Sequence, residues 1–315
     1  MKNSFSLLKQ TVLNSNSILL LTHTSPDGDA LGSTAALKLL LEKLGKTVDC
    51  FLDDTFHAVF PHLQQYFSIK KETTTAYDLI ILVDCADRSR TGVSYPTPKT
   101  IACIDHHISN PKNCDINIVD AAAAATAEII YRLMLDWEIG CDKEIAGAIF
   151  TGILTDTGGF LFQNTTKQTH EIVAHLMEYP FEHSRIVRVS MLEKTLTYSK
   201  LYAHLFENLV HFEALKAVVG HIDYDTYQKF SATPDDTEGL SAVLRNITGI
   251  ECGVLLTERE KGTIKGSIRT NETYDANELA SLVGGGGHMR AAGFRSTLTY
   301  QEIKEKIHEW LSAHQ

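Results

Sequence analysis

The sequence predicts a two-part α/β fold, in which an N-terminal parallel sheet with helices on both faces precedes a smaller C-terminal α/β domain. Short, uninterrupted apolar runs over residues 18–21, 79–83 and 101–104 are typical of strands buried on both faces. Helical patterns lie between and after these runs, and strands that alternate with helices favour a parallel, helix-covered sheet. A chain of 315 residues is long enough for two domains, because most domains contain ~100–200 residues.

The first apolar run is followed by a turn that carries three candidate ligands. His23, Asp27 and Asp29 lie close together in the sequence, and Asp29 is expected to cap a helix that starts at Ala30. Ligands bind at the carboxyl ends of strands in open α/β sheets, and imidazole and carboxylate groups together suit a divalent metal ion. Taken alone, the same residues fit an ordinary turn, a helix cap and an edge histidine equally well.

Two further apolar runs also end in acidic residues or histidines. The run 79–83 is followed at once by an aspartate, and the run 101–104 by an Asp-His-His sequence. Because the carboxyl ends of parallel strands gather at one edge of a sheet, these side chains are expected to meet. The residues predicted at this edge are His23, Asp84, Asp105, His106 and His107.

The remaining N-terminal elements are a short strand over residues 47–51 and helices over residues 121–135 and 143–154. Asp156 follows the last helix, with glycines just beyond it. A carboxylate is unfavourable at the negative end of a helix dipole, and a bound cation would offset that cost. Asp156 is therefore a further candidate ligand.

The second half of the chain predicts a helical connection and then a smaller mixed domain. Four successive glycines, residues 284–287, must end the helix before them, since glycine is costly in a helix. Their N–H groups could cradle a phosphate, although such a run is also common in ordinary loops. The predicted elements are a helix over 184–209, a strand over 214–222, a helix over 238–248, a hairpin of 253–257 and 263–269, and helices from 277 and over 301–312.

Composition excludes several classes of protein. With 43% apolar and 22% charged residues, the chain has the composition of a globular protein. A net charge of −10 argues against non-specific binding of long nucleic acid. No apolar run reaches the ~18 residues of a membrane span, and the first ten residues lack a signal-peptide core. Six scattered cysteines without a Cys-x-x-Cys pair predict reduced thiols and a cytoplasmic protein.

The order and spacing of these residues resemble the motifs of a known family. His23-x3-Asp27-x-Asp29, Asp84, Asp105-His106-His107 and Asp156 look like the four motifs of the DHH phosphoesterase superfamily. The segment Gly284-Gly-Gly-Gly-His288-x-x-Ala-Ala292-Gly293 resembles the DHHA1 domain of its nuclease branch. The resemblance is strongest to the nano-RNase A type. It implies a DHH domain over residues 1–188, a helical linker over 189–209 and a DHHA1 domain over 210–315.

The resemblance also implies two divalent metal ions. Carboxylates and imidazoles without a thiolate suit Mn²⁺, and two ions ~3.5–4 Å apart can hold a bridging water that attacks phosphorus. Asp84 would bridge the ions. The implied ligands are His23, Asp27 and Asp84 for one ion and Asp29, Asp84, His106 and Asp156 for the other.

Other residues are implied to act on the substrate. His107 should face the phosphate as a donor or general acid, and Asp105 should orient a metal-binding imidazole. The second domain should hold the distal nucleotide or its 5′-phosphate. The residues expected there are His288, Arg269, Arg245, Gly285, Gly286 and Gly287.

The implied activity is degradation of short oligoribonucleotides to mononucleotides and dephosphorylation of 3′-phosphoadenosine 5′-phosphate to AMP. The same motifs would serve a phosphodiesterase for linear signalling dinucleotides such as pApA. Three other functions fit the sequence less well. A non-catalytic nucleotide sensor should have lost at least one type of metal ligand, and a pyrophosphatase should have a different C-terminal domain. A processive DNA exonuclease should carry a channel lined by basic and aromatic residues. The sequence leaves open whether the chain forms a homodimer.

Overall fold

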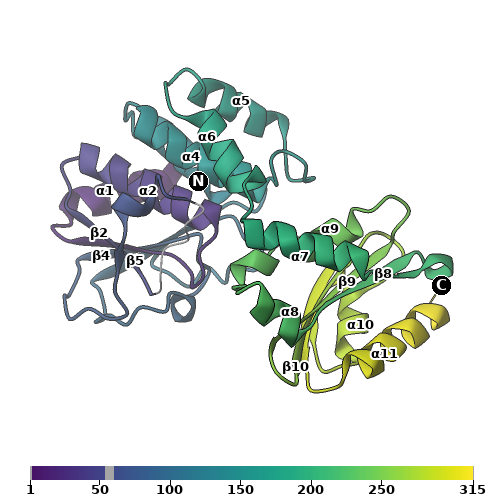
Figure 1. The fold of residues 1–315 in the computed structure, drawn as a ribbon. Coiled ribbons are helices and arrows are strands. Elements are labelled where there is room, and N and C mark those ends of the chain that lie inside the picture. The colour runs from purple at the N-terminus through teal and green to yellow at the C-terminus, as the bar shows by residue number, and fades with distance from the viewer. Residues whose placement is uncertain (1, 54–59, 315) are drawn as a thin grey trace. The chain divides into compact units, whose positions relative to one another are not determined.

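The computed structural model describes residues 2–53 and 60–314 (Figure 1). It divides into two compact units, Met1–Glu193 and Lys194–Gln315. Each unit contains its own clusters of buried apolar side chains. No helix within the described ranges combines the length and the apolar character needed to cross a membrane.

A six-stranded, fully parallel sheet forms the centre of the first unit, which confirms the predicted α/β class (Figure 1). The central strands consist of leucine, isoleucine and valine and are buried on both faces. In spatial order the strands are β3 (Ser68–Ile69), β2 (Val48–Leu52), β1 (Ile18–Leu21), β4 (Leu79–Val83), β5 (Thr100–Asp105) and β6 (Ile116–Val119).

The α-helices of this unit pack on one face of the sheet rather than on both. Among the described residues, the apolar cluster on the other face consists of strand side chains and of residues from connections, such as Tyr77, Val93 and Tyr95. The connection from β4 to β5 contains Pro96 and Pro98 and only a 3-10 turn, so it supplies no helix. The helices are α1 (Lys2–Asn14), α2 (Gly28–Lys43), α3 (Thr126–Asp136), α4 (Lys143–Asp156), α5 (Lys167–Leu176) and α6 (His183–Val187).

The second unit contains a mixed six-stranded sheet in which only the β8–β9 pair is parallel. In spatial order its strands are β11 (Gly286–His288), β12 (Ala291–Ser296), β10 (Thr263–Thr270), β9 (Cys252–Glu260), β8 (Ala217–Ile222) and β7 (Val210–Phe212). Its helices are α7 (Leu196–Glu207), α8 (Tyr224–Lys229), α9 (Leu240–Arg245), α10 (Ala276–Ser281) and α11 (Tyr300–Ala313).

Three predicted elements differ from the structure. The helix predicted over 184–209 is interrupted, because a π-helical turn follows α6 and Thr195 caps a new helix, α7, by accepting from the Tyr198 N–H. The helix predicted from residue 121 begins at Thr126. The glycine run is not only a loop, because Gly286 and Gly287 pair with β12 as part of β11. The predicted hairpin is confirmed, with Gly262 in its turn at φ +80°.

Candidate metal centre and nucleotide-binding face

The carboxyl ends of β1, β4 and β5 lie side by side, because β4 pairs in parallel with both of its neighbours. This arrangement brings the predicted ligands together in three overlapping groups of possible metal-binding atoms, each spanning no more than 4.8 Å. The groups are His23, Asp27 and Asp84; Asp29, His106 and Asp156; and Asp84, His106 and His107.

The two aspartates at the start of α2 have different roles from those expected. Asp27, not Asp29, is the N-cap, and one of its carboxylate oxygens accepts from the Asp29 and Ala30 N–H groups. Asp29 lies in the first turn and is buried, and it accepts from the Thr126 and Ala127 N–H groups at 2.6 and 3.0 Å. Its charge therefore lies at the positive end of α3, which partly offsets its burial.

Asp84 occupies the centre of the cluster in a strained backbone conformation. Its φ of +53° is in the left-handed region, which is uncommon for residues other than glycine and which is found often at functional sites. Its side chain is buried and accepts from the Thr126 hydroxyl at 2.8 Å. Thr126 is not among the residues predicted from the sequence. A threonine at a helix start is a common signal, and its contact depends on the fold.

Both histidines predicted as ligands have the same hydrogen-bond arrangement. His23 Nδ1 lies 2.9 Å from the Thr24 carbonyl oxygen, and His106 Nδ1 lies 3.3 Å from that of Ala123. A carbonyl accepts only, so Nδ1 carries the proton and Nε2 presents a lone pair. His23 Nε2 lies 3.7 Å from Asp84 Oδ2, and His106 Nε2 lies 3.4 Å from Asp156 Oδ2. A carbonyl behind a ligating imidazole is the usual arrangement at metal sites.

His107 differs from these two histidines because its Nδ1 lies against a carboxylate. The Asp105 Oδ1 atom is 2.7 Å away, and its hydrogen bond raises the pKa of His107 to about 9. Asp105 is fully buried and is also held by the Asn110 amide at 2.6 Å. Asp105 was expected to orient an imidazole that binds metal. That expectation is wrong, because the imidazole that Asp105 orients is His107, which is not one of the predicted ligands.

The carboxylates of the cluster oppose each other's ionisation. Burial raises the pKa of Asp156 to about 6, and the charges of Asp27 and Asp84 act in the same direction. Burial and the charges of Asp84 and Asp156 raise the pKa of Asp29 well above its usual value. Carboxylates that repel one another in this way, together with the imidazole nitrogens, could bind divalent metal ions, which would neutralise the carboxylates.

In the second unit, predicted substrate residues lie on one face of the sheet. Arg269 of β10 is in register with Ala291 of β12, which is in register with His288 of β11. Residues in one row of a sheet project to the same face. The next row, Ser267, Gly293 and Gly286, consists of small residues. A ligand can therefore approach this part of the sheet closely.

A cavity of about 300 Å³ opens beside this face and carries three cations, Arg259, Lys265 and Arg269. Burial and the charge of Arg245 lower the pKa of Arg269, which places two of the predicted arginines near each other. Arg259 and Lys265 are not among the residues predicted from the sequence. Each alone is an ordinary surface residue, and only the strand pairing brings them together.

The glycine run does not offer the expected cradle of free N–H groups. The Gly284, Gly285 and Gly287 N–H groups donate to Ser281 O, Ala280 O and Asn277 Oδ1, respectively. A Cβ on Gly285 would lie 2.4 Å from the Gly293 carbonyl oxygen, so glycine is needed for packing there.

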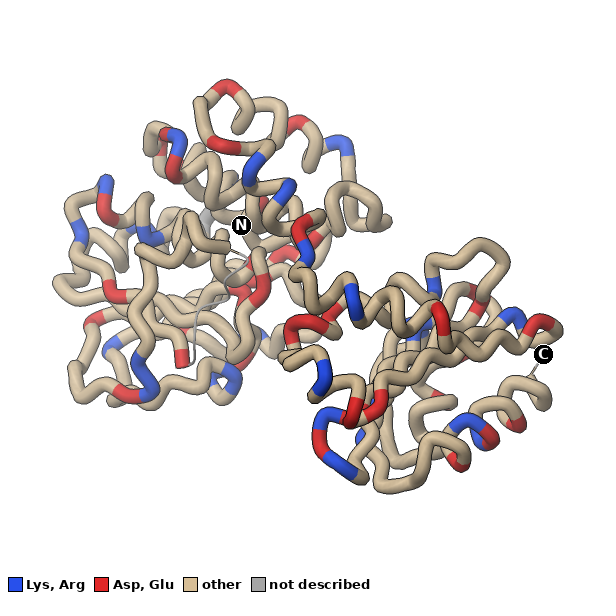
Figure 2. The backbone as a smooth tube through the Cα atoms, viewed as in Figure 1, with Lys and Arg blue, Asp and Glu red and all other residues tan. Residues whose placement is uncertain are grey.

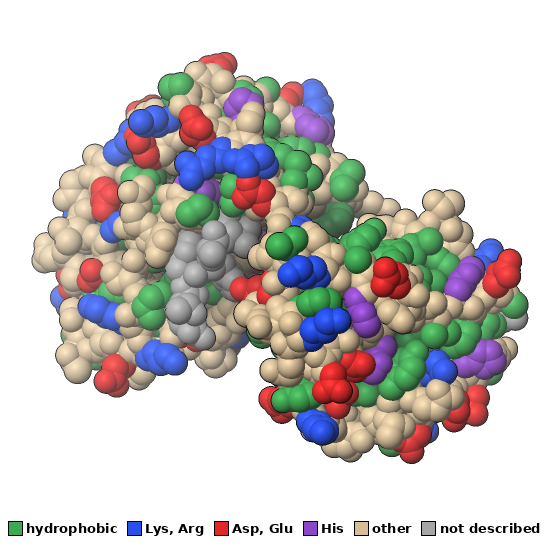
Figure 3. Space-filling view, viewed as in Figure 1, with side chains coloured by type: hydrophobic (Ala, Val, Ile, Leu, Met, Phe, Trp, Pro, Cys, Tyr) green, Lys and Arg blue, Asp and Glu red, His purple; other side chains and the backbone are tan. Residues whose placement is uncertain are grey.

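Charged residues of both signs are distributed over both units (Figure 2). On the face shown in Figure 3, the Lys and Arg side chains form small separate groups, with no continuous stripe.

Comparison with known proteins identifies two domain families. Residues 17–153 match the DHH family, N-terminal domain, and residues 214–313 match the DHHA1 domain. A protein of Thermus thermophilus named bifunctional oligoribonuclease and PAP phosphatase NrnA is 31% identical over 303 residues, which cover 94% of this chain and 90% of that protein. A Bacillus subtilis protein of the same name is 32% identical over 294 residues, with 91% of each chain covered.

A solved structure has the same fold along nearly the whole chain. An exopolyphosphatase-related protein from Bacteroides fragilis superimposes with a TM-score of 0.88 and covers 99% of this chain, and 96% of that chain is covered in turn. The two sequences are 22% identical, so this likeness concerns the fold alone.

Proposed function

The chain belongs to the DHH family and carries a DHHA1 domain, and from this premise we propose that it is a metal-dependent phosphoesterase with two related activities. It degrades short oligoribonucleotides to mononucleotides, and it converts 3′-phosphoadenosine 5′-phosphate to AMP. The relatives named for both activities match along most of their length. Both reactions are hydrolysis of a phosphate ester and differ in the leaving group.

The observation that carries the proposal is the orientation of the two ligating histidines. His23 and His106 each use Nδ1 on a backbone carbonyl and direct Nε2 at carboxylates. An Nε2 lone pair that faces a carboxylate oxygen gains no hydrogen bond from it, whereas a metal ion between the two atoms would bind both. A sensor that had lost catalysis would not have to keep every ligand type.

We assign two divalent ions, most suitably Mn²⁺, to this cluster. The described ligand groups contain only oxygen and imidazole nitrogen donors, and no cysteine belongs to any of them. When bound, such ions would supply Lewis-acid activation of water and of the phosphate. The proposed ligand sets are His23, Asp27 and Asp84, and Asp29, Asp84, His106 and Asp156.

The chain's own residues then orient the substrate and move a proton. His107, held by Asp105 and half-exposed, is charged at neutral pH, so it can donate to a phosphate oxygen or to the leaving oxygen. In the second unit, Arg269, Arg245 and His288 are proposed to bind the distal phosphate, beside Gly285, Gly286 and Gly287. Lys265 and Arg259 add positive charge to the cavity that Arg269 lines in this unit.

A side-by-side assay tests the proposal. Purified protein is incubated with a labelled RNA trimer, with pApA and with 3′-phosphoadenosine 5′-phosphate, each with Mn²⁺ and with chelator. Turnover of all three that depends on Mn²⁺ is expected. Strong preference for pApA would favour a dinucleotide phosphodiesterase, and tight binding without turnover would favour a sensor.

A further inference from the structure

A cavity of about 290 Å³ in the first unit lies away from the carboxylate–histidine cluster. Its walls come from residues 61–66, from the start of α4 and from the segment 180–189, which contains α6. None of its lining residues is a proposed catalytic or metal-binding residue. Gly147, in its wall, and Asp156 are nine positions apart on α4, which corresponds to ~13 Å along the helix.

His62 contributes an uncharged acceptor to this cavity. Its Nε2 atom lies 2.9 Å from the Thr151 hydroxyl, which itself donates to the Gly147 carbonyl oxygen at 2.7 Å. The hydroxyl proton is thus already used, so Nε2 is the donor and Nδ1 keeps a lone pair. Burial, and then the charge of Arg185, lower the pKa of His62 to about 4, so the ring is neutral at neutral pH.

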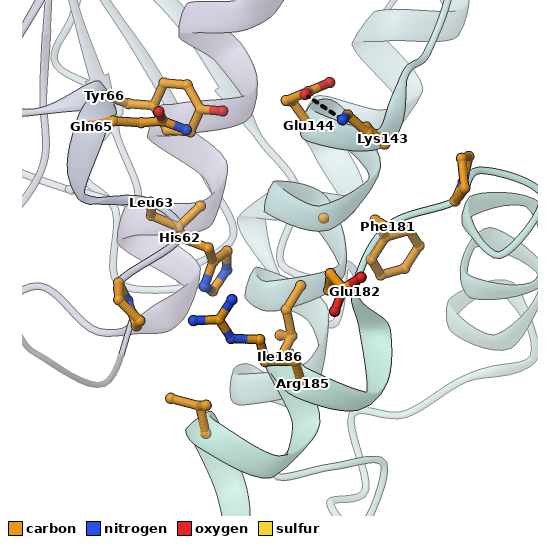
Figure 4. Close-up of a pocket in the computed structure, with 14 residues that line it drawn as sticks. His62, Leu63, Gln65, Tyr66, Lys143, Glu144, Phe181, Glu182, Arg185 and Ile186 are labelled. Carbon is orange, nitrogen blue, oxygen red and sulfur yellow. Dashed lines mark ion pairs between the residues drawn. The ribbon is translucent and has the colours of Figure 1, made fainter.

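Arg185 brings a positive charge that has no partner within residues 2–53 and 60–314. Figure 4 shows its guanidinium group and the His62 ring pointing toward one another. The other cation of the lining, Lys143, pairs with Glu144 at 3.6 Å (Figure 4). Glu182 also lines the cavity but forms no ion pair with Arg185. An unpaired guanidinium beside a cavity is a strong donor for an anionic group.

The rest of the lining combines apolar and polar side chains. Leu63, Tyr66, Phe181 and Ile186 supply aliphatic and aromatic surface beside the polar side chains. Apolar surface beside a few convergent polar groups is typical of small-molecule sites, and the volume is just below their usual range of ~300–1,000 Å³. We propose that this cavity binds a small aromatic anion, whose ring packs against the apolar walls and whose sulfonate, carboxylate or phosphate accepts from Arg185.

A pair of fluorescent probes distinguishes the contribution of the aromatic rings from that of the anionic group. 8-Anilinonaphthalene-1-sulfonate has the ring system and an anionic group, and N-phenyl-1-naphthylamine has the same rings without the charge. Saturable binding of the sulfonate to the full-length protein is expected. Arg185→Gln should weaken that binding by about tenfold or more, as loss of one charge-assisted contact does, and should leave the affinity for the neutral probe unchanged.

The matched control is Arg188→Gln. Arg188 is exposed, pairs with Glu193 and does not line the cavity, so its loss should change neither affinity. The proposal is overturned if the sulfonate does not bind saturably, if Arg185→Gln leaves its affinity unchanged or weakens both probes equally, or if Arg188→Gln has the same effect.

A second variant tests the location through the apolar wall. A Cβ on Gly147 would lie 3.6 Å from Ile186 Cδ1 and 3.7 Å from Phe181 Cβ, which is ordinary contact. Gly147→Leu therefore adds a side chain whose end occupies the cavity, and it replaces a glycine within a helix. Both probes should lose affinity while the melting temperature does not fall. Unchanged affinity for both would place the probes elsewhere and refute the site.

Discussion

Asp84 is the residue on which the proposed centre depends most. It belongs to two of the three ligand groups, is buried, and has a left-handed backbone that asparagine also tolerates. Asp84→Asn should therefore retain the fold and lose the negative charge that we propose lies between two ions. We expect the rate of Mn²⁺-dependent hydrolysis to fall by more than ~10–100-fold, which is the loss typical when a residue that only hydrogen-bonds to a metal ligand is replaced.

Steady-state rates with 3′-phosphoadenosine 5′-phosphate measure this loss. The control is Asp136→Asn, which removes an exposed carboxylate at the end of α3 and should leave the rate unchanged. If Asp84→Asn retained most of the activity, the proposal that Asp84 bridges two metal ions would be wrong.

A pH dependence follows from the crowding of carboxylates around Asp156. Its pKa is raised from 3.8 to about 6, with burial as the main cause. In the metal-free protein the folded state thus binds this proton more tightly than the unfolded state does. The contribution of Asp156 to stability is greatest at low pH and declines as the pH rises through about 6.

The variant Asp156→Asn isolates that contribution. In chelator, the melting temperature of the variant minus that of the wild type should increase between about pH 4 and about pH 7. Mn²⁺ should raise the melting temperature of the wild type more than that of the variant, because the ion offsets the same repulsion. A difference in chelator that stays constant or falls with pH would contradict this account.

The sequence predicted which residues form the cluster better than it predicted their individual contacts. The six proposed ligands could be found because each follows an apolar run or belongs to a motif. The contacts of Asp29 could not be predicted, because they depend on the position of α3, whose N–H groups bind its carboxylate. The partner of Asp105 was missed for the same reason, since Asn110 and His107 reach it through the loop after β5.

At the scale of elements, the approach of α2 to α4 positions Asp29. A Cβ on Gly32 would lie 2.4 Å from the Ala148 carbonyl oxygen, and one on Gly152 would lie 2.6 Å from Asp29 Oδ1. Gly32→Ala should force these helices apart, which typically costs ~1–3 kcal/mol and exceeds the gain in helix propensity.

Chemical denaturation measures the loss in free energy of unfolding of Gly32→Ala. The activity of this variant should fall as well, because Asp29 would move. Gly140→Ala is the control, since nothing lies within 4 Å of its added Cβ. Equal stability of both variants would show that α2 and α4 can separate without cost.

The predicted elements that were confirmed have strong local signals. The short apolar runs of β4 and β5 are typical of buried strands, and Gly262 allows the hairpin turn. The strand β11 has no such signal, since Gly286 and Gly287 are poor strand formers and are held there by β12. The break after α6 has no such signal either, because apolar residues keep a helical spacing across it, at Met191, Leu192, Leu196, Leu201 and Leu205.

At the scale of the whole molecule, the two units carry separate cores and separate chemistry. The acidic cluster and its histidines belong to the first unit, and the cavity with Arg259, Lys265 and Arg269 belongs to the second. A chain with net charge −10 can therefore still bind nucleotides, since the cations that would hold phosphate are gathered in one place.

This separation predicts variants that lose substrate binding and keep hydrolysis. Arg269 has no acidic partner among the described residues, and its guanidinium donates only to its neighbour's carbonyl. Arg269→Gln should therefore raise the KM for 3′-phosphoadenosine 5′-phosphate and for short RNA by about tenfold or more, as loss of a charge-assisted phosphate contact does. His288→Ala should act in the same direction.

Hydrolysis of a small diester, bis(p-nitrophenyl) phosphate, should change little in both variants, because this substrate lacks a distal nucleotide. Lys261→Gln, at the exposed tip of the same hairpin, removes one positive charge without touching the cavity and should behave as the wild type does. An equal loss with both classes of substrate would mean that Arg269 supports the catalytic centre itself. In that case the second unit would not be the part that selects nucleotides.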